Sequence, residues 1–480
     1  MAVVTINRDE INNRIYGCWL GKNIGGTLGG PYEGRRDILN VTGFVTPPGE
    51  PLPNDDLDLQ LVWLKVVKDR GPLGVTAAVL GEYWLNYIPP PWNEYGISKC
   101  NQRAGLPPPL SGMYDNPWKD SNGAWIRSEI WACLTPGAPD AAIRLAYADA
   151  SVDHGGAEGM FAELFTAAVQ SAAFVVHDRS TLIKIGLSKI PAGCRVARSI
   201  GIAIHSHSAG LSWQEARTKI VEDSADLGWF MAPANVAFVI LGWLYGEGDF
   251  MKSLLIATNC GDDTDCTAAT LGATLGILLG RDGLPQEWVQ YLGDRIFTVA
   301  IDRGTLHDCP TTLQQLTEQV MDQVPGALNA YHCDVRIDDT PSNYADAPPE
   351  RLLDDKVAKA IWAKPKYGVE YDFVHTRVTL DFGKQPDIAE RDPFELRVMV
   401  QNTMPDHRHI ELAWMLPDDW EVLPSRATRV SLNEDHSRSI TFQVTPRNLT
   451  AATYSGILSV TAVGRPTVGL VPLLFINAGT

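Results

Sequence analysis

The chain has no paired cysteine motif. Its eight cysteines are scattered through 480 residues, and no two of them have the CxxC spacing. Their even number leaves a set of disulfides open, but so wide a scatter favours free thiols in a cytosolic protein. A chain of this length buries enough surface to fold without covalent cross-links. We therefore expect a reduced, cytoplasmic protein.

Long hydrophobic runs are also missing. Met1–Glu10 mixes charged and β-branched residues and has no basic start leading into an apolar stretch, so we expect no signal peptide. The most apolar stretches, Val236–Tyr245 and Leu271–Leu279, are shorter than the roughly 20 residues that span a bilayer. Both observations predict that no part of the chain enters a membrane.

Positive charge is scarce. The chain has 40 Lys and Arg against 57 Asp and Glu, which gives a formal net charge of -17. A negative field repels phosphate backbones and anionic lipid, so we expect neither general nucleic-acid binding nor binding to a membrane surface. The same surplus is compatible with a metal ion, because hard cations are held by carboxylates.

The length of the chain suggests two to three domains, and its first part is helical in pattern. Up to about residue 335, apolar residues recur at three- and four-residue spacing. The clearest helices are expected at Val75–Ile88, Pro139–Ala150, Ala157–Val176, Trp213–Ala225 and Val236–Leu244. In Thr267–Gly280, glycines four residues apart form a stripe, which predicts close approach of a second helix.

After Asp354 the pattern changes to short, β-rich segments separated by turn residues, as in a small sandwich. Strands are expected at Val369–Val378, Phe394–Asn402, Ile410–Met415, Arg429–Leu432, Ser439–Val444 and Ile457–Val463. We place the boundary in the region 340–365 and predict domains 1–350 and 351–480. The expected fold class is multidomain α + β, an all-α domain followed by a small all-β sandwich.

A long proline-rich region, Ile88–Asn122, separates two of the expected helices. Loops of this length inside a domain are usually functional or disordered, and the aromatic residues here argue against disorder. They include Trp92, Tyr95, Tyr114 and Trp118, and Trp125 follows shortly after. These side chains either line a pocket or anchor the loops, and the sequence does not distinguish between these two interpretations.

Two acidic clusters stand at junctions between a loop and a helix. One is Asn54–Asp58 and the other is Asn259–Cys266. Helix capping explains one or two acids at each junction, because the helix dipole favours negative charge there. Adjacent carboxylates repel, however, and acids that converge in a turn suit a hard cation such as Mg²⁺. Spacing alone leaves capping and metal binding as open alternatives.

Short motifs occur in a fixed order between about residues 12 and 300. They are GCWLGKNIGGTLGGPYEG at 17–34, Asn54-Asp55-Asp56, Ser121-Asn122-Gly123 with Arg127, Asp153-His154, and Gly261-Asp262-Asp263-Thr264-Asp265. Together they resemble the motifs of the ADP-ribosylglycohydrolase family. The resemblance implies an all-α orthogonal fold with a pair of Mg²⁺ ions in a cleft. It also implies hydrolysis of N- or O-glycosidic bonds to ADP-ribose.

The resemblance also implies roles for individual residues. Glu33 sits where the family has a catalytic acid, and Asp120 is a candidate for positioning water. The implied metal ligands are Asn54, Asp55, Asp56, Asp263 and Asp265, and the implied substrate-binding residues are Asn122, Asp153, His154, Gly261 and Asp262. The expected cofactors are two divalent cations, Mg²⁺ first, with Mn²⁺ or Ca²⁺ as alternatives.

The chain departs from the family pattern at three positions. Asn54 replaces a metal-binding Thr, Asp262 replaces a Gly, and Cys266 replaces another ligating Thr. An Asn still offers a carbonyl oxygen, whereas a thiol is a poor ligand for hard Mg²⁺. Asp262 adds negative charge beside the expected substrate site, where a diphosphate would feel repulsion.

The C-terminal part resembles immunoglobulin-like modules that occur beside bacterial glycoside-processing enzymes. The resemblance lies in Val400-Gln401-Asn402, Leu416–Val422 and Thr445-Pro446. Such a module packs on a catalytic domain, mediates a homo-oligomer or binds sugar. We expect Trp420 to be a core residue rather than a sugar platform.

The predicted function is metal-dependent hydrolysis of an N- or O-glycosidic bond, with a binuclear site that activates water and binds sugar hydroxyls. One alternative is hydrolysis of a non-ADP-ribosyl glycoside or nucleoside. Another is a pseudo-enzyme that binds ADP-ribose or a sugar without cleaving it.

Overall fold

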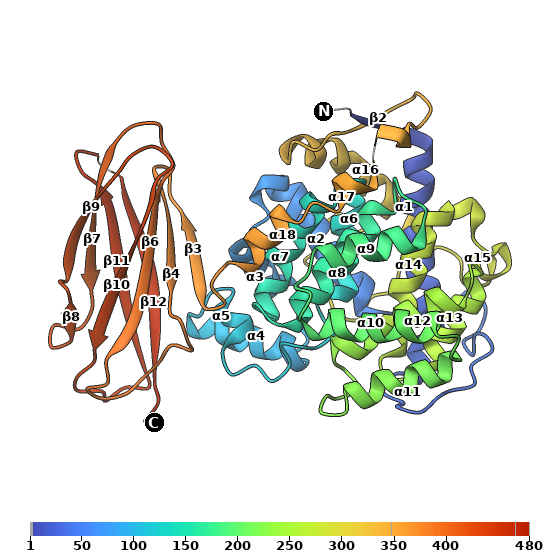
Figure 1. The fold of residues 1–480 in the computed structure, drawn as a ribbon, viewed down its shortest axis with the longest axis horizontal. Coiled ribbons are helices and arrows are strands. Elements are labelled where there is room, and N and C mark those ends of the chain that lie inside the picture. The colour runs from blue at the N-terminus through green and yellow to red at the C-terminus, as the bar shows by residue number, and fades with distance from the viewer. Residues whose placement is uncertain (1–2, 347, 466, 480) are drawn as a thin grey trace. The chain divides into compact units, whose positions relative to one another are not determined.

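The computed structural model describes residues 3–346, 348–465 and 467–479 (Figure 1). The chain forms two compact units. The first comprises Met1–Lys99 and Asn116–Ala363, and the second comprises Cys100–Asp115 and Lys364–Thr480. The second unit therefore contains a segment from the middle of the helical region as well as the C-terminal strands.

The first unit is helical. Its longer helices are α1 (Arg8–Gly29), α2 (Asp55–Arg70), α3 (Ala77–Tyr87), α7 (Pro139–Asp153), α8 (Glu158–Ala172), α9 (Arg179–Ser188), α10 (Arg195–Ser208), α11 (Trp213–Asp223), α12 (Ala232–Tyr245), α13 (Phe250–Asn259), α14 (Thr264–Gly283) and α16 (Leu313–Ala330). Shorter ones are η1 (Gly30–Tyr32), η2 (Pro72–Gly74), η3 (Trp125–Arg127), α6 (Glu129–Leu134), α15 (Gln286–Leu292), η4 (Tyr344–Asp346), α17 (Pro349–Leu352) and α18 (Lys356–Trp362). α4 (Asn93–Ala104) begins in this unit. The five clearest helices expected from the sequence are present as α3, α7, α8, α11 and α12.

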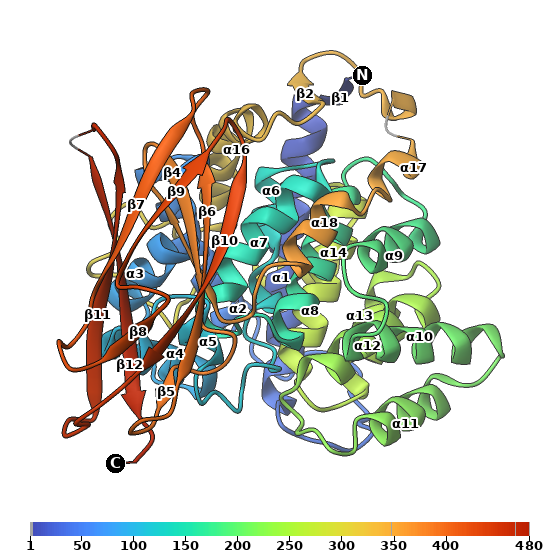
Figure 2. The ribbon, with the colours of Figure 1, turned by 60° about the vertical axis from the view of Figure 1, so that its left-hand side comes forward.

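Helix α14 lies against the part of α1 that runs from about Gly17 to Gly29 (Figures 1 and 2). A Cβ built on Gly17, Gly21, Gly25 or Gly29 of α1 would lie 2.0–2.4 Å from the nearest backbone atom of α14. The predicted glycine stripe of α14 is thus confirmed, and its partner is a second stripe on α1. The pairs run in opposite directions, with Gly17 against Gly276 and Gly29 against Thr264. The end of α1 therefore meets the acidic start of α14.

A short pair of strands completes this unit. Strands β1 (Val4–Asn7) and β2 (Val335–Asp338) form a short parallel pair that the sequence did not indicate. Every one of the eight cysteines is a free thiol, as expected. Among the described residues, no helix combines the length and apolar character needed to cross a bilayer.

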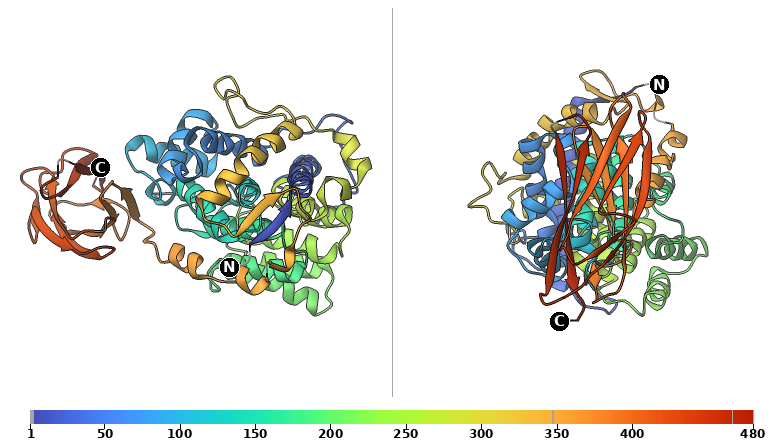
Figure 3. Two further views of the ribbon diagram at one scale, coloured as in Figure 1. Left: turned by 90° about the horizontal axis from the view of Figure 1, so that it is seen from above. Right: turned by 90° about the vertical axis from the view of Figure 1, so that its left-hand side faces the viewer.

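The second unit is a sandwich of two five-stranded sheets, seen end-on in the left panel of Figure 3. One sheet has the order β3-β4-β6-β10-β8 and the other the order β5-β12-β11-β7-β9. The strands are β3 (Gly368–Asp372), β4 (Thr376–Asp381), β5 (Asp387–Ile388), β6 (Phe394–Asn402), β7 (Arg408–Met415), β8 (Glu421–Leu423), β9 (Ala427–Leu432), β10 (Ser437–Thr445), β11 (Thr453–Ala462) and β12 (Val468–Asn477). The single strand expected at Val369–Val378 is instead a hairpin, because the chain turns between β3 and β4.

Alternating residues of both sheets build the sandwich core, as the period of a strand requires. Trp420 is 2% exposed and its Nε1 donates to the carbonyl oxygen of Arg447 at 3.1 Å, which confirms it as a core residue. The inserted segment Cys100–Asp115, which contains α5 (Leu110–Met113), adds Leu106 and Leu110 to the same core. The sandwich core is therefore completed from outside its own strands.

Candidate functional site

A cavity of about 440 Å³ lies in the helical unit where the ends of several helices meet. Its polar lining consists of Glu33, Asn54, Asp55, Asn93, Glu94, Asp263, Asp265 and Cys266. Aromatic side chains form part of its wall: Trp92, Tyr95, Trp229 and Phe230. Two of the aromatics from the proline-rich region, Trp92 and Tyr95, therefore line a pocket.

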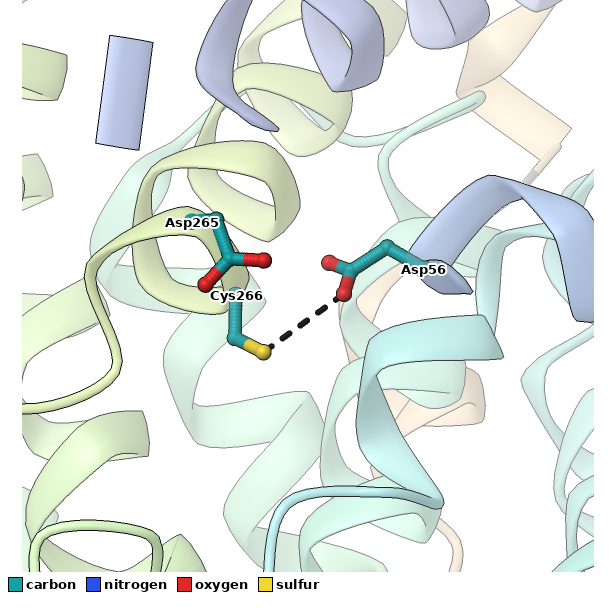
Figure 4. A group of neighbouring side chains, drawn as sticks. All are labelled: Asp56, Asp265 and Cys266. Carbon is teal, nitrogen blue, oxygen red and sulfur yellow. Dashed lines mark hydrogen bonds between the residues drawn. The ribbon is translucent and has the colours of Figure 1, made fainter. Parts of the chain in front are cut away.

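The start of α2 and the start of α14 bring the two acidic clusters together. Asp265, Cys266 and Asp56 offer ligand atoms that all lie within 4.8 Å of one another. Figure 4 shows Asp56 from α2 facing Asp265 and Cys266 from α14. Glu33, which follows η1, forms a second group with Asp263 and Asp265 within the same limit. Residues more than 200 positions apart thus converge on one point.

Helix geometry explains why the acids stand where they do. Asn54 is the N-cap of α2, and its side-chain oxygen accepts a hydrogen bond from the amide of Asp56 at 2.8 Å. Asp263 precedes the first residue of α14, and no side-chain cap bond forms there. Capping thus explains the position of Asn54. It does not explain the carboxylates at the start of α14, because no side chain there makes a capping hydrogen bond.

The acids of this cluster destabilise one another's charged forms. Partial burial and the negative charges of Asp265 and Asp55 raise the pKa of Glu33 to about 7. Burial, with a contribution from Glu33, raises the pKa of Asp263 to about 7. Burial and Asp263 raise the pKa of Asp265 well above its ordinary value. Such a cluster is favourable only when protons or a cation neutralise it.

The residues present fit a hard divalent cation. One oxygen of Asp263 and one of Asp265 are buried and have no hydrogen-bond donor among the described residues. Carboxylate oxygens are the ligands that Mg²⁺ prefers. Cys266 does not suit the same ion, because burial and four neighbouring acids raise the pKa of its thiol well above the usual range. The thiol instead donates to Asp56 Oδ1 at 3.5 Å.

Three neutral side chains orient the acids. Asn122 donates from Nδ2 to Asp263 Oδ2 at 2.7 Å, and Asn235 Oδ1 accepts from the Asp263 amide at 3.1 Å. The Tyr95 hydroxyl donates to Asp55 Oδ2 at 2.9 Å. Such outer contacts fix the direction in which a ligating carboxylate points.

Lys22 is a buried cation that the sequence analysis did not single out, although it lies inside the glycine-rich motif. Its Nζ is 3.2 Å from Asp56 and 3.1 Å from Glu129, and it also donates to the carbonyl oxygen of Ile126. Burial lowers the pKa of Lys22, but Glu129 and Asp56 raise it above its ordinary value. Asp56 therefore already has one positive partner.

Behind the cavity, Arg127 organises a second buried group. It donates to Asp149 at 2.9 Å and to both oxygens of Asp153 at 2.8 and 3.1 Å. His154 Nδ1 lies 2.9 Å from Asp153, and its Nε2 lies 3.3 Å from the hydroxyl oxygen of Ser121. Asp153 and His154 are fully buried and do not line the cavity.

Glu94 is the lining acid that the sequence analysis missed. It stands in the first turn of α4, is 1% exposed, and offers a carboxylate oxygen within 4.8 Å of ligand atoms of Asp153 and His154. This group is a poor metal site, because both oxygens of Asp153 already accept from Arg127. No motif marks Glu94, and only its place in the first turn of a helix hints at it.

Besides Asp153 and His154, five expected site residues are absent from the cavity lining: Asp56, Asp120, Asn122, Gly261 and Asp262. Asp120 Oδ1 accepts from the amide of Glu158 at 3.0 Å, at the start of α8. Gly261 has φ +76 and passes so close to the carbonyls of Arg35 and Asp37 that a Cβ would lie 2.5 Å from each oxygen. Asp262 is 2% exposed, and its carboxylate lies 3.5 Å from Arg36 Nε. Asp262 therefore carries a charge that Arg36 offsets.

Comparisons with known proteins bear on the same region. The profile of the ADP-ribosylglycohydrolase family matches residues 7–326. An ADP-ribosylarginine hydrolase, Tri1 of Pseudomonas putida (strain GB-1), is 40% identical over 47 residues, which are 10% of this chain and only 13% of that protein.

Two solved structures are also similar. An ADP-ribosylglycohydrolase-related protein complex gives a TM-score of 0.39 at 18% identity, over 68% of this chain and 99% of that one. A FixG-related protein from Vibrio parahaemolyticus gives 0.18 at 11% identity, over 22% of this chain and 99% of that one. The family profile covers well over half of the 480 residues, and it spans both acidic clusters. The chain belongs to the ADP-ribosylglycohydrolase family.

Proposed function

We propose that this chain is a divalent-metal-dependent hydrolase that cleaves an N- or O-glycosidic bond, with ADP-ribosylated compounds as the first substrate class to test. The observation that carries the proposal is the convergence of Glu33, Asp263 and Asp265 on one point of the cavity. The proposed binuclear site uses Asp55 and Asp56 from α2 and Asp263 and Asp265 from α14. Family membership and the short match to an ADP-ribosylarginine hydrolase support the choice of substrate.

The bound cations would supply Lewis acidity and a template for water and sugar hydroxyls. The remaining steps belong to the chain. Asp55 and Asp263 keep their orientation through Tyr95 and Asn122. Glu33 would accept the proton of the water that adds to the anomeric carbon. The transition state of this cleavage would be oxocarbenium-like, as in other glycoside hydrolyses.

The test measures release of free ADP-ribose from ADP-ribosylarginine with Mg²⁺, Mn²⁺ or Ca²⁺, and after treatment with EDTA. Turnover should require a cation, and Asp263→Asn or Asp265→Asn should lower it by at least about a hundredfold. Asp282→Asn is the matched control, because Asp282 is an exposed acid at the other end of α14. Undiminished turnover in EDTA together with fully active Asp263 and Asp265 variants would exclude the proposed mechanism.

A second candidate is a glycoside or nucleoside without phosphate. It is favoured by the charge of the cavity wall, which contains no Lys or Arg among the described lining residues. A diphosphate needs positive partners or backbone amides to offset its charge. Competition separates the two candidates: ADP-ribose should inhibit cleavage of 4-nitrophenyl ribofuranoside more strongly than ribose does, unless the natural substrate lacks phosphate. Tight binding of either sugar without any turnover would instead indicate a pseudo-enzyme.

A further inference from the structure

Glu94 lines the cavity, and its buried carboxyl group lies with Asp153 and His154 rather than with the acidic cluster of Glu33, Asp263 and Asp265. It is 1% exposed, and neither of its oxygens meets the geometry of a hydrogen bond in the described part of the chain. Ordinary buried carboxyls are paired, because an isolated one is costly. A buried acid of this kind, at the wall of a pocket, can form a hydrogen bond with a bound ligand.

The surrounding residues shape a place for this carboxyl. A Cβ built on Gly123 would lie 2.1 Å from Glu94 Oε1, so the glycine leaves the room that the carboxyl occupies. His154 and Asp153 stand behind it at the end of α7, and Tyr95 follows it on α4. Asp153 is neutralised by Arg127, at 2.8 Å. Arg127 therefore pairs with Asp153 and Asp149 and makes no ion pair with Glu94.

The alternative is a purely structural role, in which Glu94 stabilises the start of α4 through the helix dipole. An acid in the first turn does so as well from the surface, where its charge stays solvated. Burial works against that role, because it disfavours the charged form that the dipole attracts. Burial raises the pKa of Glu94 to about 7, although His154 and the nearby Ser121 hydroxyl lower it, and Asp153 raises it further. Near neutral pH the group is therefore well placed to carry a proton.

We infer that Glu94 is a second catalytic residue, the acid that protonates the leaving group of the glycosidic bond. This inference rests on the proposed function. The O–H bond of the Glu94 carboxyl breaks, and its proton bonds to the leaving nitrogen or oxygen. The bond between that atom and the anomeric carbon breaks, and its electron pair stays with the leaving group. Water adds to the carbon and gives its proton to Glu33, after which both carboxyls exchange protons with solvent.

The experiment compares Glu94→Gln with the unaltered protein on two substrates of different leaving group. ADP-ribosylarginine or methyl ribofuranoside needs a proton on the departing atom, whereas 4-nitrophenyl ribofuranoside releases a stable anion. The variant should lose about 10²- to 10⁴-fold in kcat/KM on the first type and about tenfold or less on the second. The activity of the unaltered protein should fall at alkaline pH, because Glu94 loses its proton there. The activity of the Glu94→Gln variant should show no such fall. Glu82→Gln, an exposed change on α3, is the control.

Equal losses on both substrates would overturn the inference, because they indicate a merely structural role for Glu94. If the unaltered protein cleaves none of the probes with any cation, the proposed function itself fails. Infrared spectroscopy then decides the state of Glu94 independently of turnover. The carbonyl band of a protonated carboxyl should be present at neutral pH and lost in Glu94→Gln, and an unchanged band would overturn the inference as well.

Discussion

Gly21 and Gly272 touch through their backbones: a Cβ built on Gly21 would lie 2.0 Å from the carbonyl oxygen of Gly272. This contact fixes how far the acidic start of α14 stands from the end of α1. Four such positions along α1 are occupied by glycine, so two helices approach with no side chain between them. The register of that contact places Glu33 beside Asp263 and Asp265.

The first prediction follows from this contact. Gly21→Ala should destabilise the protein by at least about 1–3 kcal/mol, because overpacking forces the backbones of both helices apart. Gly201→Ala on α10 is the matched control, since no atom lies within 4 Å of a Cβ built there. That variant should gain roughly 0.5–1 kcal/mol from helix propensity. Urea unfolding of both variants is the measurement, and equal stabilities would contradict the packing argument.

A second prediction concerns cation binding. Cations should raise the Tm of the protein by mass action, and more at pH 8 than at pH 5. The reason is that Glu33 and Asp263 have pKa values of about 7, so protons compete with the cation in more acidic solution. Differential scanning fluorimetry after EDTA, with and without Mn²⁺, gives the shift. The double variant Asp263→Asn/Asp265→Asn should show none, and a shift of unchanged size in it would place the cation elsewhere.

Asn122 provides a third test, because it holds Asp263 without charge of its own. Asn122→Ala removes the 2.7 Å hydrogen bond to Asp263 Oδ2. Loss of such an outer contact typically costs about 10- to 100-fold in metal affinity. Calorimetric titration with Mn²⁺ should show that loss, while Asn86→Ala on the exposed side of α3 should bind like the unaltered protein. Equal affinity in the Asn122 variant would mean that Asp263 needs no orientation.

The fourth prediction is the effect of acid on the Arg127 group. Burial raises the pKa of Asp153, but Arg127 and His154 lower it further, to about 2. An unfolded Asp titrates at about 3.9, so the stabilisation by Asp153 is complete above that pH and disappears as the pH falls towards 2. Asp153→Asn should cost about 3–5 kcal/mol at pH 7. That difference from the unaltered protein should narrow between about pH 4 and pH 2, and a difference independent of pH would contradict the assignment.

The fifth prediction tests the inserted segment. Leu106 is 1% exposed and belongs to the sandwich core, so Leu106→Ala should cost about 2–5 kcal/mol in the unfolding of that unit. Leu73→Ala, at a site that is 69% exposed, should be nearly neutral. Calorimetry of thermal unfolding measures the stability of both variants. A neutral Leu106 variant would show that the segment adds nothing to the core.

Local patterns in the sequence are sufficient for much of this structure. The helical spacing locates α7, α11 and α12 to within a few residues, and the glycine stripe of α14 predicts a close helix contact. The sequence does not identify α1 as the partner of α14, because tertiary packing determines which helix lies against the glycine stripe. The acidic junctions are evident in the composition and in the family motifs, but their convergence depends on how the starts of α2 and α14 pack together.

The missed residues show where such reasoning ends. Lys22 and Glu94 carry no spacing signal, because each acts through contacts with a distant part of the chain. The sequence predicts that Asp262 binds substrate because it lies inside the Gly261-Asp262-Asp263-Thr264-Asp265 motif. Its φ of +61 sends the side chain towards Arg36 instead, outside the cavity lining. A backbone conformation of that kind is not visible in a run of acids.

The insertion of Cys100–Asp115 into the sandwich unit also has a consequence for synthesis. Leu106 and Leu110 leave the ribosome roughly 250 residues before Lys364, where the rest of their unit begins. At about 5–20 residues per second, that delay is on the order of tens of seconds. Throughout it these leucines lack their final partners, so the nascent chain carries an apolar segment that chaperones can bind until the last strands emerge.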